Sequence, residues 1–377
     1  MDVQNDFESF QGHIWLNAAS EGPLPKISAM ALREAVRWKS APHLLDIPKF
    51  AQVPAKLKTV IAEMIGVNAS DVILGNSASY GLHLLANGIP WADKDEILLM
   101  QNDFPTDILP WLYLEHQGVR VKQLRPVKHV FTPEEVRNHI GPKTRLLCLS
   151  HVHTFSGQVL QVEAIGKICQ ENGVLFILNL SQSAGTRPID LSSGDIDGVV
   201  CAGYKWLLGP YGTGFSWMKP ELRQKLDYNQ SYWISSLNEE DLKNEGPISL
   251  KQSSSARKYD IFGTANFFNF VPLEASIQYL LNLGVAAIQQ YQHHLVKIIL
   301  EEIDQKKYQV ISSQENSQLS SLCVFSHKEP QNNAKIFNLL KNHQIHGAFW
   351  KNNIRLSPHI YNSPDDVKRC CSVLNKV

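Results

Sequence analysis

Short apolar runs alternate with a helix-like stretch through the middle of the chain. The apolar runs span residues 145–150, 173–178 and 198–202, and each ends in polar or small residues. Between the first two, apolar side chains recur at helical spacing over 161–172, and Gly173 follows as a helix stop. Runs this apolar are typical of strands buried on both faces, and their alternation with helices predicts a mostly parallel sheet with right-handed crossovers.

The C-terminal third has a different pattern. Gly284 separates two helical stretches, and the segments after them predict one strand and two more helices, namely 319–325, 334–341 and 364–374. A chain of 377 residues is too long to fold around one small hydrophobic core. We therefore expect a large α/β domain over 26–270 and a smaller α+β domain made of 1–25 and 271–377.

One lysine stands between a predicted buried strand and a glycine-rich loop. Lys205 follows the strand at 198–202 and precedes the sequence Gly-Pro-Tyr-Gly-Thr-Gly at 209–214. The carboxyl end of a strand is where open α/β sheets bind ligands, and lysine is rarely buried without a chemical reason. Lys205 is thus a candidate Schiff-base nucleophile, and a surface lysine in a turn is the alternative.

These segments together resemble the class V aminotransferase group of fold-type I enzymes, which use pyridoxal 5'-phosphate. The group includes cysteine desulfurases, selenocysteine lyases, kynureninase and isopenicillin N epimerase-like proteins. The similarity extends from Trp15-Leu16-Asn17-Ala18-Ala19 to the segment 355–362, and the lysine motif is its strongest part. It implies the pyridoxal-phosphate-dependent transferase fold of type I, with a mostly parallel, seven-stranded-type sheet in the large domain.

The resemblance assigns roles to residues around the cofactor. Lys205 would form the Schiff base and then move protons near the substrate Cα, as a desolvated amine can near neutrality. Ser77, Ala78 and Ser79 match the phosphate loop, which would bind the phosphate at a positive helix end. Without the resemblance, Ser-Ala-Ser before a helix is an ordinary N-cap.

Four further side chains would surround the cofactor. Phe104 stands where many relatives have a histidine that stacks on the pyridine ring, and Gln182 would hydrogen-bond the phenolic oxygen. Tyr204 would donate its hydroxyl to the phosphate. His153, in a His-Val-His sequence, is expected beside the cofactor or in a structural role; with no acidic or cysteine partner at ligand spacing, we predict no metal site.

Asn179 departs from the family pattern. Relatives have an aspartate here that pairs with the protonated pyridine nitrogen, whereas an amide carries no charge. The acids at Asp190, Asp195 and Asp197 offer no obvious replacement. Either the reaction needs little electron withdrawal by the ring, or activity is reduced or lost, and we expect Asn179→Asp to raise ordinary transamination.

The substrate and a partner subunit would contact three other positions. Arg355 resembles the arginine that binds the substrate carboxylate, for which a guanidinium fork is suited. Asn17 lies in a segment that folds over the active site in the family. Thr264, in the sequence Gly-Thr-Ala-Asn, resembles a loop that reaches the neighbouring subunit's phosphate, which implies a homodimer; read alone it is a turn before a helix.

Composition narrows the range of functions. With 36 basic and 36 acidic residues, the chain has no global charge that would attract nucleic acid or an anionic membrane. The first residues lack a signal-peptide apolar region and no apolar run is long enough to span a bilayer, so we expect a cytoplasmic protein. The six cysteines lack Cys-x-x-Cys spacing, and none lies between His327 and Arg355, where desulfurases carry their nucleophile. Buried, reduced thiols are expected, and persulfide-forming desulfurase chemistry is disfavoured.

Two classes of function remain. The first is a pyridoxal-phosphate enzyme that acts on an amino acid by transamination, Cβ elimination or epimerisation. The second is a protein of the same fold with reduced or no catalysis, which serves as a binding or scaffold subunit. Asn179 favours the second class, whereas Lys205, Gln182 and Arg355 together favour the first. The side-chain pocket lies on loops, so the amino acid used cannot be read from the sequence.

Overall fold

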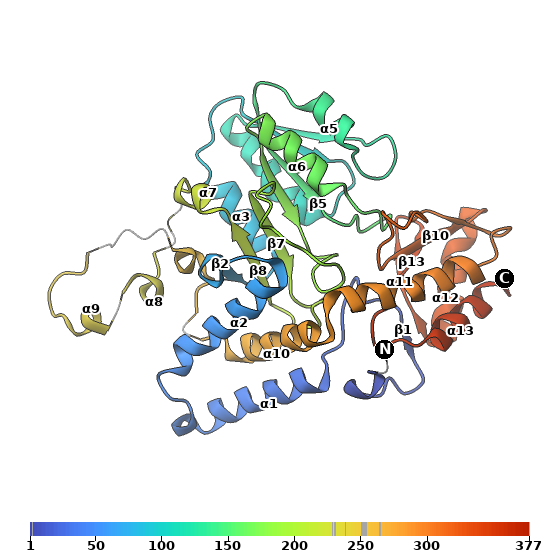
Figure 1. Ribbon diagram of the computed structural model, residues 1–377, viewed down its shortest axis with the longest axis horizontal. Helices are drawn as coiled ribbons and strands as arrows, with labels where there is room; N and C mark the ends of the chain where they lie inside the picture. The colour runs from blue at the N-terminus through green and yellow to red at the C-terminus, as the bar shows by residue number, and fades with distance from the viewer. Residues whose placement is uncertain are drawn as a thin grey trace.

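A seven-stranded sheet forms the centre of the protein (Figure 1). The computed structural model describes residues 1, 3–227, 229, 231–237, 239–249, 255–263 and 265–376. The strand order is β2-β8-β7-β6-β5-β3-β4. The strands are β2 (Val72–Gly75), β3 (Glu96–Met100), β4 (Arg120–Leu124), β5 (Thr144–Ser150), β6 (Leu175–Asn179), β7 (Gly198–Ala202) and β8 (Gly214–Met218).

Five neighbouring strands of this sheet, from β7 to β4, run parallel, and β8 runs antiparallel to both of its neighbours. The predicted mostly parallel sheet is therefore confirmed. The parallel strands end at Met100, Ser150, Asn179 and Ala202, and Ser150 pairs in register with Asn179. Since parallel strands end at one edge, the polar residues that follow them converge there.

Helices cover both faces of the sheet, because alternate residues of each strand enter different cores. Leu146, Ile177 and Val200 join a core with Leu82 of α3, whereas Leu147 and Leu178 join the core on the opposite face. This doubly covered arrangement explains why the strands are apolar throughout rather than alternating. The helices of the large domain are α1 (Lys26–Ser40), α2 (Lys49–Ile65), α3 (Ala78–Gly88), α4 (Leu109–Leu112), α5 (Pro133–His139), α6 (Val162–Glu171) and α7 (Pro220–Gln224), followed by α8 (Trp233–Ser236), α9 (Glu239–Lys243) and α10 (Phe267–Leu283).

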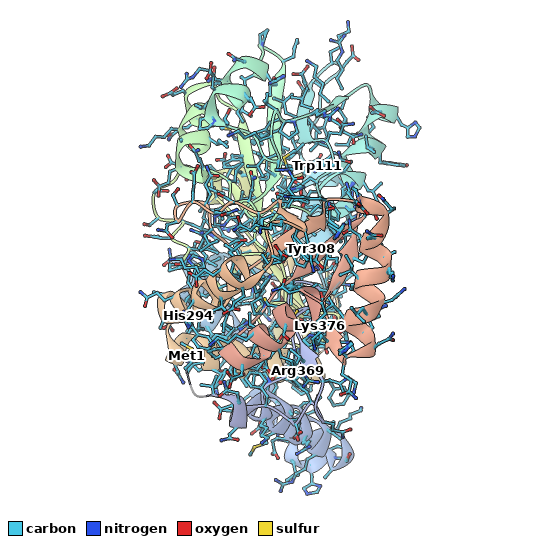
Figure 2. All side chains as sticks on the ribbon, turned by 90° about the vertical axis from the view of Figure 1, so that its right-hand side faces the viewer. Met1, Trp111, His294, Tyr308, Arg369 and Lys376 are labelled. Carbon is cyan, nitrogen blue, oxygen red and sulfur yellow. The ribbon has the colours of Figure 1, made fainter. Side chains whose placement is uncertain are left out.

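A four-stranded antiparallel sheet, in the order β12-β13-β10-β9, forms the small domain on the right of Figure 1. Figure 2 looks onto this side, with Tyr308, Arg369 and Lys376 on the C-terminal part and Trp111 on the large domain. A two-stranded parallel sheet, β1-β11, joins the N-terminal segment to it. The elements are β1 (Ile14–Trp15), α11 (Val285–Glu302), β9 (Tyr308–Val310), β10 (Cys323–His327), α12 (Asn333–Asn342), β11 (Ile345–His346), β12 (Ala348–Trp350), β13 (Asn353–Leu356) and α13 (Pro364–Leu374).

The two cores divide later in the chain than residue 270. Leu273, Ile277 and Leu280 of α10 belong to the large-domain core, and the small-domain core takes its first α11 residue at Leu295. The reason is that α10 packs along α1 and α2, where the Ser28 hydroxyl donates to the Pro272 carbonyl. No single helix among the described residues is both long and apolar enough to cross a bilayer; only the bent pair of α10 and α11 passes such a test jointly.

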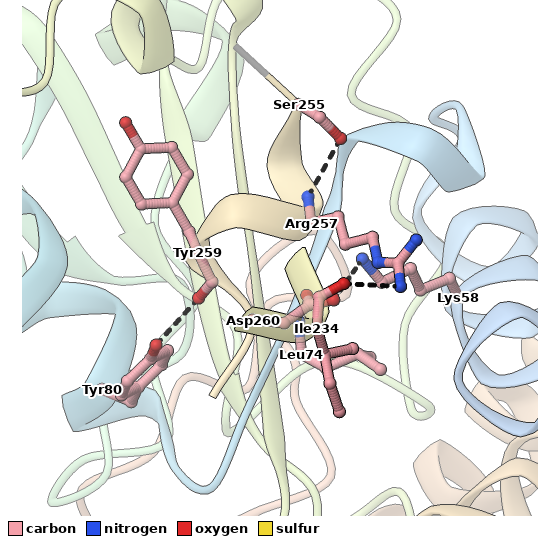
Figure 3. A network of polar contacts seen from close by, with 8 residues as sticks. All are labelled: Lys58, Leu74, Tyr80, Ile234, Ser255, Arg257, Tyr259 and Asp260. Atoms are coloured by element: carbon pink, nitrogen blue, oxygen red, sulfur yellow. Dashed lines mark hydrogen bonds and ion pairs between the residues drawn. The ribbon is translucent and has the colours of Figure 1, made fainter. Parts of the chain in front are cut away.

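A polar network joins the segment 255–261 to the edge of the large sheet (Figure 3). Asp260 accepts a hydrogen bond from the Leu74 amide, at 2.8 Å, and its carboxylate lies 2.8 Å from Lys58 Nζ. The Tyr80 hydroxyl of α3 donates to the Tyr259 carbonyl. The network therefore connects α2, β2 and α3. The predicted phosphate loop lies between β2 and α3.

Candidate active site

Lys205 lies three residues beyond β7 and points into a cavity at the carboxyl edge of the sheet. Its side chain is 6 % exposed, and Nζ has no hydrogen-bond or ion-pair partner among the described residues. The Phe104 ring lies beneath it, with its centroid 5.0 Å from Nζ. A buried amine that no protein group neutralises is costly unless a ligand uses it, so this observation points to chemistry at Lys205.

Burial lowers the pKa of Lys205 and the positive charge of Arg355 adds to this effect, so that the pKa is about 8. Cys201 and Asp107 act in the opposite direction. Near neutrality a substantial fraction of the amine is therefore uncharged and nucleophilic.

The cavity brings together most of the residues that the sequence predicted around a cofactor. Ser77, Ala78, Ser79, Phe104, Asn179, Gln182, Tyr204 and Lys205 all line it. Thr106, Ser150, Thr154, Ser181 and Ala202 line it as well and were not predicted. Each of these five lies at or beyond the end of a strand, or beside a residue that was predicted, which is the signal by which they could have been found.

The wall at β2 and α3 is a helix N-terminus of the kind that binds phosphate. Ser77 is the N-cap of α3, and its Oγ accepts a hydrogen bond from the Tyr80 amide at 3.2 Å. The amides of Ala78 and Ser79, in the first turn, have no partner within the helix. Ser79 Oγ lies 3.2 Å from Thr106 Oγ1, so two hydroxyls stand beside these amides. The predicted N-cap and the predicted anion site are the same structure.

Gln182 has one amide proton left for a ligand. Its Nε2 donates to the Ala19 carbonyl at 2.9 Å, and its Oε1 accepts from the Trp206 indole at 2.7 Å. Nε2 carries two protons, and only one has a partner among the described residues. The bonds to Ala19 and Trp206 hold the side chain in the position where that second proton is available to the cavity.

Asn179 also lines the cavity, and both of its amide atoms are bound by the protein. Its Oδ1 accepts from the Ser181 amide at 2.9 Å, and its Nδ2 donates to Asp107 Oδ1 at 2.7 Å. Asp107 is 1 % exposed. The acids expected as possible replacements for an aspartate at Asn179 were close to it in the sequence, whereas Asp107 comes from the loop after β3.

Arg355 and Asn17 lie beside the cavity rather than on its wall. Arg355 is 2 % exposed; it donates to the Ser20 hydroxyl at 2.7 Å and to the Thr154 carbonyl at 3.3 Å. Its Nε and the Oδ1 of Asn17 are buried polar atoms without a partner. Asn17 bridges to Ser357, directly after β13, so the N-terminal segment and the arginine strand are adjacent. Unsatisfied buried groups at such a place are open to a ligand.

His153 is not part of the observed cavity wall. His153 is buried, but its Nδ1 contacts Ser156 Oγ and its Nε2 contacts the Asn102 carbonyl, at 2.8 and 3.2 Å. Its neighbour Thr154 takes the place at the cavity that was expected of His153. Thr264 lies outside the described residues.

All six cysteines are buried and unpaired. Burial raises the pKa of Cys201 and Cys323, so their thiols are protonated at neutral pH. Neither their accessibility nor their protonation state is that of a nucleophilic cysteine.

Comparison with known proteins identifies the family of the chain. A model of the aminotransferase class-V family matches residues 46–369. An uncharacterized aminotransferase of Bacillus subtilis, YcbU, is 25 % identical over 96 % of this chain and 94 % of its own. Isopenicillin N epimerase of Amycolatopsis lactamdurans is 26 % identical over 76 % of this chain and 74 % of its own. A probable cysteine desulfurase of Methanothermobacter thermautotrophicus is 24 % identical over 77 % and 72 %.

Solved structures share the fold. The apo structure of a cysteine desulfurase from Thermococcus onnurineus superimposes with a TM-score of 0.87 at 19 % identity, covering 100 % of this chain and 97 % of that one. The cystine C-S lyase C-DES gives a TM-score of 0.86 at 21 % identity, with 97 % and 99 % covered.

Proposed function

The chain belongs to the aminotransferase class-V family, and from this we propose that it binds pyridoxal 5'-phosphate covalently through Lys205 and acts on an amino acid. The observation that carries the proposal is the partnerless, buried amine of Lys205 among Phe104, Gln182 and the N-terminus of α3. When bound, this cofactor supplies an aldehyde that condenses with a lysine amine and a ring that withdraws electrons from the bond to be broken.

The residues of the cavity have separate roles in this proposal. The α3 N-terminus, with Ser77 and Ser79, binds the phosphate. Phe104 packs against one face of the ring, and Gln182 donates its remaining amide proton to the phenolic oxygen. Lys205 would remove and return protons at the substrate Cα, because burial keeps part of its amine uncharged.

Arg355 is the group we propose for the substrate carboxylate. Its guanidinium is fixed by Ser20 and Thr154, while its Nε has no partner. The attraction between the substrate carboxylate and the guanidinium of Arg355 compensates part of the cost of keeping that cation buried. Asn17, with its partnerless Oδ1, lies on the same side and accepts a hydrogen bond from the substrate.

We propose that the reaction is not a persulfide-forming desulfuration. The segment between His327 and Arg355 has no cysteine, and all six thiols are buried. Transamination, Cβ elimination and epimerisation remain, each of which begins with proton removal or bond cleavage at Cα. Detection of a protein persulfide after incubation with cysteine, by mass spectrometry of the intact chain, would refute this exclusion.

We also propose a homodimer as the working unit, on the resemblance of the 263–264 segment to a loop that reaches the neighbouring site. Analytical ultracentrifugation decides this directly. A single species at twice the mass of the chain is expected, and a monomer that nevertheless binds the cofactor would contradict it.

The test of the main proposal is an absorbance titration of the purified protein with pyridoxal phosphate, beside Lys205→Ala. A band that depends on Lys205, and that changes with one amino acid in a screen, is the expected result. No band, with no difference between the two proteins, would show that the fold serves binding or assembly instead.

A further inference from the structure

Two buried carboxyl groups lie behind the cavity, in the loop after β3. Asp103 is 3 % exposed and Asp107 is 1 % exposed. Neither lines the cavity, but Ser150 and Asn179, which do, contact them directly. These two acids have no role in the proposal so far, and buried acids are retained at a cost.

The hydrogen bonds around Ser150 favour a proton on one of these acids. Ser150 Oγ lies 2.7 Å from Asp103 Oδ1 and 2.9 Å from Asp107 Oδ2. A hydroxyl has a single proton, so it cannot donate a full-strength bond to both carboxyls, whereas it can accept from one that is protonated. Two carboxyls this close together also disfavour a second negative charge, so we assign one negative charge and one proton to the pair.

The proton belongs on Asp107. Asp103 accepts hydrogen bonds from the amides of Phe104 and Ser150, at 2.8 and 3.0 Å, so both of its oxygens already face backbone donors. Asp107 has no backbone donor among the described residues. Burial raises the pKa of Asp107 and the charge of Asp103 adds to this effect, so that the pKa is about 8.

The other oxygen of Asp107 determines how Asn179 is oriented. Asp107 Oδ1 accepts from Asn179 Nδ2, while the Ser181 amide donates to Asn179 Oδ1. Turning the Asn179 amide by 180° would set its oxygen against Asp107 Oδ1 and its NH₂ against the Ser181 amide, and both bonds would be lost. The Asn179 side chain thus has one permitted orientation, and its second Nδ2 proton has no partner among the described residues.

We propose that Asp107 is a positioning residue for the pyridine end of the cofactor: it fixes the Asn179 amide, and with Ser150 and Asp103 it places one shared negative charge behind that amide. The inference rests on the proposed function. In the family pattern a carboxylate contacts the ring nitrogen directly. In this chain the carboxyl group of Asp107 lies behind Asn179, and the Asn179 amide would separate it from the ring. The charge nearest the ring is therefore set by the Asp103–Asp107 pair.

Other titratable groups face this pair from the neighbouring elements. Lys205 acts on Asp107 from the β7 side, and Cys148 of β5 lies close enough for Asp107 to raise its pKa. His153 and Lys351 interact with Asp103. A pH-dependent change in the wild type is therefore assigned to the pair only if it is altered in variants of Asp107.

The pairing has a consequence for Asn179→Asp. That change alone sets a second carboxyl where Asn179 Nδ2 now lies, 2.7 Å from Asp107 Oδ1, so the protein must take up another proton or repel the new group. The expectation that Asn179→Asp alone improves transamination ignored this neighbour. The double variant, Asn179→Asp with Asp107→Asn, keeps one amide and one carboxylate in contact. Position 107 then supplies the donor and position 179 the acceptor.

The first experiment uses the protein without cofactor. Urea unfolding at neutral pH is measured for the wild type, Asn179→Asp, Asp107→Asn and the double variant. We expect the double variant to recover about tenfold in the unfolding equilibrium constant relative to Asn179→Asp, because contacting residues are coupled. Additive effects of the two changes would show that the residues do not act as a pair and would overturn the inference.

The second experiment follows the absorbance of the protein loaded with pyridoxal phosphate as a function of pH. Asp107→Asn should remove one of the pH-dependent steps of the wild type, and Asp107→Ala should raise the dissociation constant of pyridoxal phosphate by roughly threefold to tenfold. The matched control is Asp95→Asn, a buried acid at the opposite end of β3 that pairs with Arg145. It should lower stability and leave the spectral profile unchanged.

The outcomes separate this inference from the proposed function. If the wild type shows a Lys205-dependent band but Asp107→Asn keeps the complete wild-type pH profile, Asp107 is structural only and the inference falls while the function stands. If the wild type shows no Lys205-dependent band, the proposed function falls and the cofactor role of Asp107 falls with it.

Discussion

The proposed chemistry of this protein depends on one buried amine, that of Lys205. Lys205 is buried against Phe104, without any partner among the described residues, and the nearest fixed cation is Arg355. Burial and that cation both lower the pKa of the amine, which ends at about 8. In the proposed mechanism desolvation thus keeps part of the Lys205 amine nucleophilic near neutral pH, and no general base among the described residues contacts it.

Covalent attachment of pyridoxal phosphate should follow this pKa. Below about pH 8 most of Lys205 is protonated and cannot attack the aldehyde, so the rate rises with pH and levels off above that value. In Arg355→Gln the neighbouring positive charge is lost, the pKa of Lys205 rises, and the midpoint moves to higher pH. Stopped-flow absorbance over a pH series measures both; an unmoved midpoint in Arg355→Gln would contradict the coupling.

Arg355 also distinguishes two kinds of substrate. Arg355→Lys replaces a planar fork with a point charge, so the KM of amino acids should increase by about tenfold or more. Amines that lack the carboxylate do not use the fork and should react nearly as in the wild type. Steady-state kinetics with an amino acid and its decarboxylated amine test this, and equal losses for both would remove Arg355 from the site.

Sequence reasoning identified the side chains whose roles depend on a motif, and it missed those that depend on a contact. Lys205 was predicted from its place after a buried strand, and Phe104 and Gln182 from the resemblance to the family. Asp107 was given no role, since its contact with Asn179 joins the loop after β3 to the end of β6, 72 positions apart in the sequence. No spacing rule identifies such a pair before the strand order is known.

The elements that build the site were predicted well where their apolar pattern is regular. Strand β7 (Gly198–Ala202) and helix α13 (Pro364–Leu374) have the predicted bounds. Helices α1 and α2 were not predicted; α1 keeps Ile27 and Met30 exposed, so its apolar residues do not form one stripe. The antiparallel direction of β8 was not predicted either, because a buried strand is apolar whichever way it runs.

The start of α3 should bind phosphate and cap the helix at once. Ser77→Ala removes the N-cap bond to Tyr80, which costs about 1 kcal/mol of stability, and raises the dissociation constant of pyridoxal phosphate by about tenfold. Ser363→Ala removes the equivalent bond to Asp366 at the start of α13, away from the cavity. It should cost similar stability with no change in cofactor affinity; equal affinity losses in both variants would contradict the assignment of Ser77.

The contact of Asp260 with Lys58 should stabilise the edge of the sheet beside the phosphate loop. Lys58→Ala removes the cation closest to a mostly buried carboxylate and is expected to lower the free energy of unfolding by about 1–3 kcal/mol. Arg37→Ala breaks an exposed pair with Glu34 on α1 and should cost no more than about 0.5 kcal/mol. Urea denaturation of both variants gives the comparison, and equal losses would show that the Lys58 pair is no more than a surface contact.

At the level of the molecule, two cores meet at the N-terminal segment and at α11. Phe7 and Ala19 pack with the large core, whereas Ile14 and Leu16 pack with the small one. The sequence predicted two domains but placed α10 in the wrong core, because an apolar stripe shows that a helix is buried and not which partner buries it. The domain arrangement places Arg355 of the small sheet beside Lys205 of the large one.

Stability should fall as the pH rises toward 8, in part because of Asp107. Its pKa is raised from 3.8 to about 8 on folding, so the folded chain binds a proton that the unfolded chain releases. The stabilisation is complete below the unfolded pKa and is lost as the pH passes the folded one. Asp107→Asn should flatten this part of the profile of unfolding free energy against pH; an unchanged slope would mean that Asp107 is ionised in the folded protein.

The most direct test of the whole account is chemical. The protein is incubated with pyridoxal phosphate, reduced with borohydride, digested and sequenced by mass spectrometry. The account predicts that the reduced cofactor is attached to the peptide containing Lys205, and that Lys205→Ala carries none at any specific position. Attachment spread over surface lysines, equal in the two proteins, would contradict it.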